Sequence, residues 1–192
     1  WYQDTEGRPV NRHDTGYAVV YRDYQGGKLK KVNYEGFQEQ EYGAVLNRKT
    51  GVAAIEYIYN TEGQKQKEKY YGTDGEPVLR SDVGCAVWEF RYDDVGRCNN
   101  ESYHDTNGKL IIRKDRGYAS IKRTYNEAGQ CASTRYFGAE GEPVISKEYH
   151  CAGYDYGYDD WGNTTGNTYI GLDGKPMVRR DLGYASVQSE YD

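Results

Sequence analysis

Short stretches in which apolar and polar residues alternate recur along the chain, and each predicts a half-buried β-strand. In residues 119–125 the alternate positions are Ala119, Ile121, Arg123 and Tyr125, and residues 86–92 repeat the order with Ala, Trp, Phe and Tyr. A period of two is typical of a strand that has one covered face. A turn such as DDVG or NEAG follows each stretch, and a more polar strand comes after the turn. The pattern therefore predicts β-hairpins.

The alternation returns with a period of 33 residues. The segment YYGTDGEPV and its counterparts open with the aromatic residues Tyr70, Tyr103, Tyr136 and Tyr169. If this aromatic residue is place zero, place sixteen is Ala in every unit, as in Ala86 and Ala119. A fixed period of this length indicates a repeat architecture, in which each unit buries its apolar face against its neighbours. The units span residues 2–36, 37–69, 70–102, 103–135, 136–168 and, in part, 169–192.

Glycine and proline positions predict the turns and an additional strand. Gly75, Gly108, Gly141 and Gly174 each follow an acidic or amide residue, or its equivalent, in a turn that requires positive φ. Proline comes two residues later in most units and marks a strand start or edge, because it has no N–H to donate. We therefore expect about three short strands per repeat. The predicted fold is all-β, either an elongated β-solenoid or a continuous array of β-hairpins.

The limits of the chain suggest one repeat array that continues beyond it. Trp1 precedes a unit boundary by one residue, Asp192 falls inside a turn, and the only methionine is Met177. Repeat arrays normally end in atypical capping units, and none is visible. We expect residues 1–192 to be a single array and a fragment of a longer protein, with neighbouring repeats or domains as its partners.

Composition favours a thin sheet with tyrosine in its core. Hydrophobic residues make up 36% of the chain and the mean hydropathy is −1.01, yet there are 22 tyrosines. Tyrosine buries a large ring and keeps its hydroxyl in contact with polar groups. No apolar run approaches 18 residues, so we expect no membrane span. The net charge is −5 and the basic residues are scattered, which argues against nucleic acid as a partner.

The four cysteines fall at two places of the repeat. Cys85 and Cys151 share place fifteen, and Cys98 and Cys131 share place twenty-eight. Their spacing matches no zinc motif. We expect buried or half-buried thiols, with a Cys98–Cys131 disulfide as the alternative. That disulfide requires Cα atoms within roughly 7 Å, which coils stacked about 4.8 Å apart would allow and a flat meander would not.

Nothing in the sequence predicts catalysis, a cofactor or a metal. His13, His104 and His150 occupy different repeat places and have no matched nucleophile. The paired acids, such as Asp93–Asp94 and Asp159–Asp160, lie in turns, where they bond the local backbone. A calcium loop would need more oxygen ligands at close spacing than these turns offer. His150 replaces a turn glycine in the most aromatic unit, which indicates either sequence drift or a specialised binding surface.

The turn motifs resemble those of known bacterial repeats. The segments YDDVGRCNNESY (from Tyr92), YNEAGQCASTRY (from Tyr125) and YDDWGNTTGNTY (from Tyr158) are similar to the YD repeat of RHS-type proteins, in which Tyr-Asp-x-x-Gly-Arg begins a hairpin. YYGTDGEPV is also similar to the hairpins of glucan-binding and choline-binding surface repeats. The period is longer than that of a usual YD unit, and the GW pairs of choline-binding repeats do not recur. The resemblance implies tandem hairpins on a bacterial surface-exposed or secreted protein, with a cytoplasmic location as the alternative.

The function expected from these features is non-catalytic binding of carbohydrate or cell-wall polymer by rows of aromatic rings. The expected ligand-binding residues are Tyr71, Trp88, Phe137, Tyr156 and Trp161. One alternative is a structural spacer, stalk or RHS-like shell segment in which tyrosine serves only as core. Another is an accessory repeat domain of a cell-surface-polymer transferase. Burial of the place-zero tyrosines would favour the spacer, and exposed ring faces at the five residues would favour binding.

Overall fold

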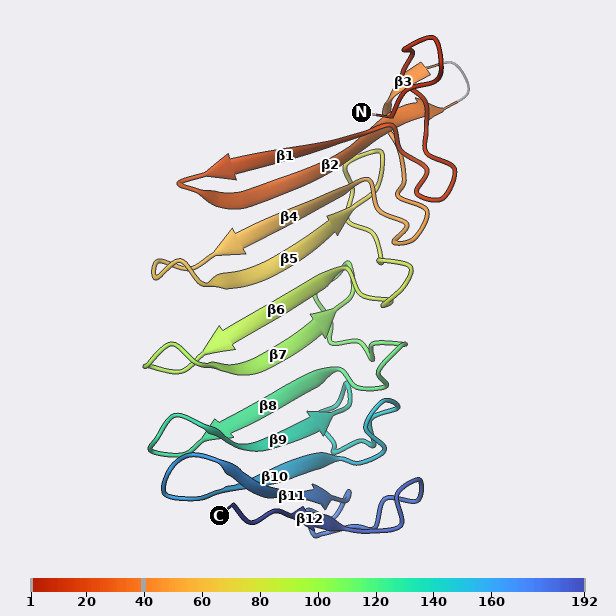
Figure 1. Cartoon of the computed structure of the whole chain (residues 1–192). Helices are drawn as coiled ribbons and strands as arrows, with labels where there is room; N and C mark the ends of the chain where they lie inside the picture. Colours follow the sequence, from red (N-terminus) through yellow and green to blue (C-terminus); the bar gives the residue numbers. More distant parts are fainter. Residues whose placement is uncertain (1, 39–40, 192) are drawn as a thin grey trace. The chain divides into compact units, whose positions relative to one another are not determined.

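The computed structural model describes residues 2–38 and 41–191, so Trp1 and Asp192, at which the array was expected to be cut, lie outside the described residues. Within these ranges the chain forms strands and no helix (Figure 1). The strands are β1 (Val19–Gln25), β2 (Lys28–Gln38), β3 (Glu41–Ala44), β4 (Ala54–Tyr59), β5 (Lys65–Tyr71), β6 (Val87–Tyr92), β7 (Cys98–His104), β8 (Ser120–Tyr125), β9 (Cys131–Phe137), β10 (Gly153–Tyr158), β11 (Thr164–Ile170) and β12 (Ser186–Gln188).

The chain divides into two compact units. The first contains the residues up to Glu89 together with His104–Lys109, and the second contains Phe90–Tyr103 and the chain from Leu110 onward. In the first unit the hydrogen-bonded order is β1-β2-β4-β5 followed by the first residues of β6, with β3 beside β2, and in the second unit it is β7 (up to Tyr103)-β8-β9-β10-β11-β12. The pairings are antiparallel. The predicted all-β class is confirmed, and the prediction of a single array stays a prediction.

A β-bulge precedes the last tyrosine of β4, β8 and β10, and the hydroxyl of that tyrosine bonds to the preceding hairpin. In β8 the register shifts between Thr124 and Tyr125, and in β10 it shifts between Gly157 and Tyr158. Tyr125 Oη donates to Cys98 O at 2.7 Å, and Tyr158 Oη donates to Cys131 O at 2.9 Å. A bulge redirects a side chain in this way because it inserts one unpaired residue into the ladder. The hydroxyl therefore joins two hairpins beyond the end of their short ladder.

The predicted turn conformations are present at the expected glycines. Gly75, Gly108, Gly141 and Gly174 have φ between 76° and 85°. Only His150, among the described residues other than glycine, has positive φ, at 54°. His150 takes the place of a turn glycine in the repeat, so the turn persists there without glycine. Its side chain is exposed.

The third strand expected in each repeat forms in the second repeat, as β3 beside β2, and does not form in the repeats that carry proline. In the repeats that carry proline, the segment after the glycine turn makes one isolated bridge, between Gln3 and Pro9, Tyr71 and Pro77, Phe137 and Pro143, or Ile170 and Pro176. Proline lacks the N–H that would continue the ladder. The next residue folds back on its own unit instead: Val78 N donates to Tyr70 O at 3.0 Å, and Val144 N donates to Tyr136 O at 3.1 Å. The complete repeats that carry proline therefore have two strands and one bridge each.

The recurrent alanine lies where two hydrogen bonds converge in the core. Ala119 N donates to Phe137 O at 2.7 Å, while Ala119 O accepts from Tyr103 N at 3.0 Å. Ala86 has the same two bonds, to His104 O and from Tyr70 N. Both alanine side chains are buried, at 0–1% exposed. The backbone of this residue is held by hydrogen bonds at both its N–H and its C=O, and its side chain is fully enclosed. The space there accommodates a methyl group, which explains the recurrent alanine.

The cysteines are thiols, and the Cys98–Cys131 disulfide is excluded. Cys98 Sγ lies 3.6 Å from Asn100 O, and Cys131 Sγ lies 3.4 Å from Ser133 O. Cys98 begins β7 and Cys131 begins β9, with β8 between them. Two strand spacings of about 4.8 Å exceed the reach of a disulfide. No helix among residues 2–38 and 41–191 is long and apolar enough to cross a membrane.

Candidate functional site: a tyrosine groove in the second unit

Strand register in the second unit gathers tyrosines on one face of the sheet. Tyr154 of β10 lies opposite Thr134 of β9 and Tyr169 of β11, and Tyr156 lies opposite Asn167. Tyr136 of β9 lies opposite Ile121 of β8. Residues that face each other across antiparallel strands lie on the same side of the sheet. This side is called the tyrosine face of the second unit.

The rings on this face, with rings from the adjoining connections, form a continuous series of contacts. Tyr118 stacks on Tyr136 with centroids 4.7 Å apart, and Tyr136 stacks on Tyr149 at 5.7 Å. Tyr149 meets Tyr154 edge to face at 5.8 Å, and Tyr154 stacks on Tyr156 at 5.8 Å. Aromatic pairs at these separations stabilise each other beyond the area they bury. The series is therefore held in place before any ligand arrives.

An open groove of about 450 Å³ lies over these rings and is called the tyrosine groove. Tyr118, Tyr136 and Tyr169 are buried in its wall, whereas Tyr149, Tyr154 and Tyr156 are half-buried and contribute accessible ring surface. The remaining lining residues are Arg116, Ile121, Arg123, Thr134, Asn167 and Arg179. Burial raises the pKa of Tyr154, so its phenol is neutral at physiological pH. A surface with several rings and a few polar groups is typical of a small-molecule site.

The three arginines of the tyrosine groove are held by acids that do not line it. Arg123 Nη2 lies 2.6 Å from Glu101 Oε1, and Arg179 Nη2 lies 2.6 Å from Asp181 Oδ2. Arg116 Nη1 lies 2.7 Å from Glu148 Oε2. Within residues 2–38 and 41–191, none of the side chains that line the groove is a carboxylate. The groove therefore presents neutral phenols and cationic guanidinium groups.

The sequence prediction missed a recurrent stack of arginine on the place-zero tyrosine. Arg80 pairs with Asp82 through two bonds of 2.8 Å and lies over the Tyr70 ring at 5.2 Å. In the second unit Arg179 lies over the Tyr169 ring at 4.8 Å. The signal was present as Arg-x-Asp at places ten and twelve, and it recurs at residues 12–14, 80–82, 113–115 and 179–181. The guanidinium group covers the ring and keeps it unavailable to ligand.

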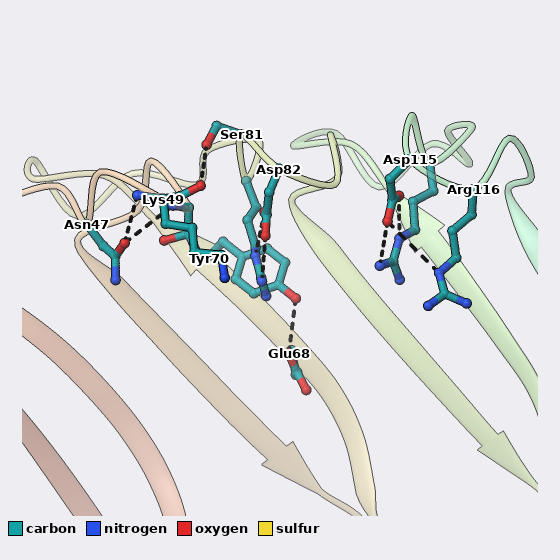
Figure 2. A network of polar contacts seen from close by, with 11 residues as sticks. Asn47, Lys49, Glu68, Tyr70, Ser81, Asp82, Asp115 and Arg116 are labelled. Carbon is teal, nitrogen blue, oxygen red and sulfur yellow. Dashed lines mark hydrogen bonds and ion pairs between the residues drawn. The ribbon is translucent and has the colours of Figure 1, made fainter. Parts of the chain in front are cut away.

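Figure 2 shows the contacts around the Tyr70 ring, in the first of the two compact units. Tyr70 Oη donates to Glu68 Oε2 at 3.0 Å, and burial raises the Tyr70 pKa. In the preceding repeat, residues 37–69, place ten is Asn47, whose side-chain oxygen accepts a hydrogen bond from Lys49 N at 3.0 Å. Ser81 Oγ then donates to Lys49 O at 3.4 Å. An arginine at place ten stacks on tyrosine, whereas Asn47 and its counterpart Ser146 cap the local turn. The figure also draws the ion pair between Arg116 and Asp115, at 4.0 Å.

The structure distributes the five expected ligand-binding residues over several surfaces. Tyr156 lines the tyrosine groove, and Phe137 lies on the opposite face of the second unit, under Lys122 Nζ at 4.9 Å. Trp161 is 86% exposed in a hairpin turn. Trp88 is half-buried in β6, with Lys65 Nζ 5.5 Å from its ring. Tyr71 belongs to a second groove.

That second groove, of about 330 Å³, lies in the first unit and is polar. Tyr71 Oη donates to Glu56 Oε2 at 2.7 Å, and burial with this bond raises the Tyr71 pKa to about 12. Lys31, Asn33 and Glu35 line the same groove. Its charges are mixed, and among its described lining residues only Tyr71 and Tyr34 are aromatic. It lacks the stacked surface of the tyrosine groove.

The turn acids are engaged by the local backbone, as the sequence indicated. Asp93 Oδ1 accepts from Val95 N at 3.2 Å and from Arg97 N at 2.8 Å. Asp159 Oδ1 accepts from Trp161 N and Asn163 N, and hydrogen bonds to Asn163 lower the Asp159 pKa. Within the described ranges, 2–38 and 41–191, no three His, Cys, Asp or Glu side chains are grouped as metal ligands.

No protein-family model matches the chain, and no curated protein matches it with significant similarity. The likeness to YD and surface repeats therefore depends on the motif residues alone.

Proposed function

We propose that this chain is a non-catalytic module that binds carbohydrate, with the tyrosine groove as its binding site. The observation that carries the proposal is the placement of three half-buried rings, Tyr149, Tyr154 and Tyr156, around an open groove of about 450 Å³. Flat apolar ring surface stacks on the faces of sugar rings, and polar groups at the edges orient hydroxyls. Thr134 and Asn167 supply such groups.

The same proposal includes an arrangement of tandem hairpin repeats in place of a solenoid. Its support is the recurrence, at like-numbered places, of the buried tyrosine, the buried alanine and the positive-φ glycine. Successive strands pair antiparallel, which a two-strand repeat produces directly. The motif resemblance favours a bacterial surface-exposed or secreted protein and a cell-wall polymer as the carbohydrate. An accessory domain of a polymer transferase would use the groove in the same way.

A structural spacer is the second candidate, because the place-zero tyrosines belong to the core. Tyr70, Tyr103, Tyr136 and Tyr169 are 0–5% exposed. These rings cannot form a binding row, so the row expected from the sequence has no basis at place zero. The rings that are available for binding belong to the fifth repeat. This repeat has Ser146 in place of arginine at place ten, and Tyr149 stacks on Tyr136 instead.

Retention of the full chain on immobilised glycans tests the proposal. Wild-type protein is expected to bind at least one cell-wall saccharide, and Tyr149→Ala and Tyr156→Ala are expected to weaken that binding at least tenfold, or about 1.4 kcal/mol. Trp161→Ala is the matched control, because it removes an exposed ring outside the groove. Circular dichroism verifies that each variant is folded. Absence of retention by a folded wild-type chain would favour the spacer.

A further inference from the structure

We propose that the tyrosine groove selects saccharides that carry an anionic group, a carboxylate or a phosphate. This inference rests on the proposed function and specifies its ligand class. The groove is lined by Arg116, Arg123 and Arg179, and no acid lines it among the residues that the structure describes. Guanidinium groups match carboxylate and phosphate oxygens through paired N–H donors. A choline-like cation would meet three positive charges and is disfavoured.

One acidic position of the repeat is uncharged in the repeats that form this face. Place thirty-one of the repeat is Glu68 in the second repeat and Glu101 in the third. The same place is Thr134 in the fourth repeat and Asn167 in the fifth. Glu68 accepts a hydrogen bond from Tyr70, and Glu101 pairs with Arg123. Thr134 and Asn167 occupy the corresponding position on the floor of the groove without negative charge. The fourth and fifth repeats thus lack the acid that would repel an anionic ligand.

The arginines retain donors for a ligand. A guanidinium group has five N–H donors, and each ion pair described above uses only some of them. Glu148, Glu101 and Asp181 hold the guanidinium groups from outside the lining, so the positive partner of each ion pair is the one that lines the groove. This arrangement fixes the arginine side chains in place, so a bound anion would not have to order them.

A buried hydroxyl in the groove wall is a second, independent observation. Tyr118 is 0% exposed, and its Oη has no hydrogen-bond partner within bonding geometry. A buried polar group without a partner costs about 1–3 kcal/mol. Burial raises the Tyr118 pKa and the Arg116 guanidinium opposes that rise, which places the two groups close together. An anion bound by Arg116 would accept a hydrogen bond from the Tyr118 hydroxyl.

Isothermal titration calorimetry on the full chain tests the inference with four probes. The probes are tetragalacturonate, a glycerol-phosphate oligomer, an uncharged galactan tetramer and a choline-bearing saccharide. We expect at least tenfold tighter binding of one or both anionic probes than of galactan, with affinity falling as salt rises from about 0.05 to 0.5 M. The carboxylate and phosphate arms identify which anion is preferred. Equal affinity for galactan, or tighter binding of the choline probe, would overturn the inference.

Asn167→Asp adds one negative charge to the lining with little change in shape. It is expected to weaken anionic probes at least tenfold and to leave galactan within twofold. Asn107→Asp, in an exposed turn of the first unit, is the charge-matched control. If Asn167→Asp and Asn107→Asp behave alike while saccharide still binds, the anion preference is wrong and the saccharide site stands. If no saccharide binds the folded chain, the proposed function itself fails.

Tyr118→Phe separates a ligand contact from a structural role. Because the hydroxyl has no partner in the unliganded protein, its removal is expected to leave the melting temperature equal or higher. The affinity for the anionic probe is expected to fall about three- to tenfold. A lower melting temperature with unchanged affinity would contradict the role given to this hydroxyl.

Discussion

The tyrosines that join neighbouring hairpins give the sharpest test of the architecture. Tyr158→Phe removes one hydroxyl, which donates to Cys131 O at 2.9 Å, and keeps the ring. Tyr125→Phe does the same for the 2.7 Å bond to Cys98 O, and the stacking of Arg97 on that ring is retained. An intramolecular hydrogen bond of this kind contributes about 0.5–1.5 kcal/mol. Each variant is expected to lose that amount from the free energy of unfolding.

Urea unfolding followed by circular dichroism measures the loss. For a chain of this size a change of about 1 kcal/mol lowers the melting temperature by about 2–4 °C. Tyr24→Phe is the control, because Tyr24 occupies the same repeat place but is 62% exposed. We expect that substitution to stay within about 0.5 kcal/mol of wild type. If Tyr125→Phe and Tyr158→Phe match Tyr24→Phe, the hydroxyl-to-carbonyl bond does not join the hairpins.

Two further predictions concern packing and pH. Gly153→Ala would press a Cβ against the Thr134 carbonyl oxygen, so we expect a loss of about 1–3 kcal/mol or more in urea unfolding. Gly157→Ala would meet the Thr165 hydroxyl at 2.9 Å, with backbone atoms no nearer than 4.0 Å, and should cost less; equal losses would contradict this packing. Burial alone would raise the Asp82 pKa, but the ion pair with Arg80 outweighs it and the folded-state pKa is lowered. A lowered carboxyl pKa stabilises the fold above the unfolded pKa of about 3.9, and that contribution is lost as pH falls through the folded pKa. Asp82→Asn should therefore flatten the fall in melting temperature below about pH 4, and an unchanged slope would show that this pair does not contribute.

Local signals made the strands and turns predictable from sequence. The alternation at Ala119, Ile121 and Tyr125 lies in or beside β8, and Gly75 and Gly108 adopt the positive φ that their turns require. The third strand was wrong for the repeats whose segment contains proline, because Pro77 and Pro143 close one bridge each and donate nothing further, whereas the second repeat has no proline there and forms β3. Proline has no backbone N–H, so the pairing cannot continue past the bridge and no strand forms in these segments.

The groove was less predictable, because it depends on which rings the neighbouring residues cover. Tyr70 and Tyr169 are covered by arginines from the Arg-x-Asp motif, and nothing in the hydropathy pattern indicates this. Of the five expected residues only Tyr156 lines the tyrosine groove. Phe137 is adjacent in sequence to a groove residue, Tyr136, but the strand period of two places it on the other face. Register across four strands decided the site, and it required the structure.

The most direct test of the tyrosine groove as the binding site is a titration of ring-labelled protein, in which the tyrosine rings carry ¹³C, with an anionic oligosaccharide followed by NMR. The ring signals of Tyr149, Tyr154 and Tyr156 are expected to shift together and to saturate at one affinity, while those of Tyr24 and Tyr191 stay unchanged. Shifts confined to Tyr71 and the first-unit groove, or no shift at saturating saccharide, would contradict the assignment of the site.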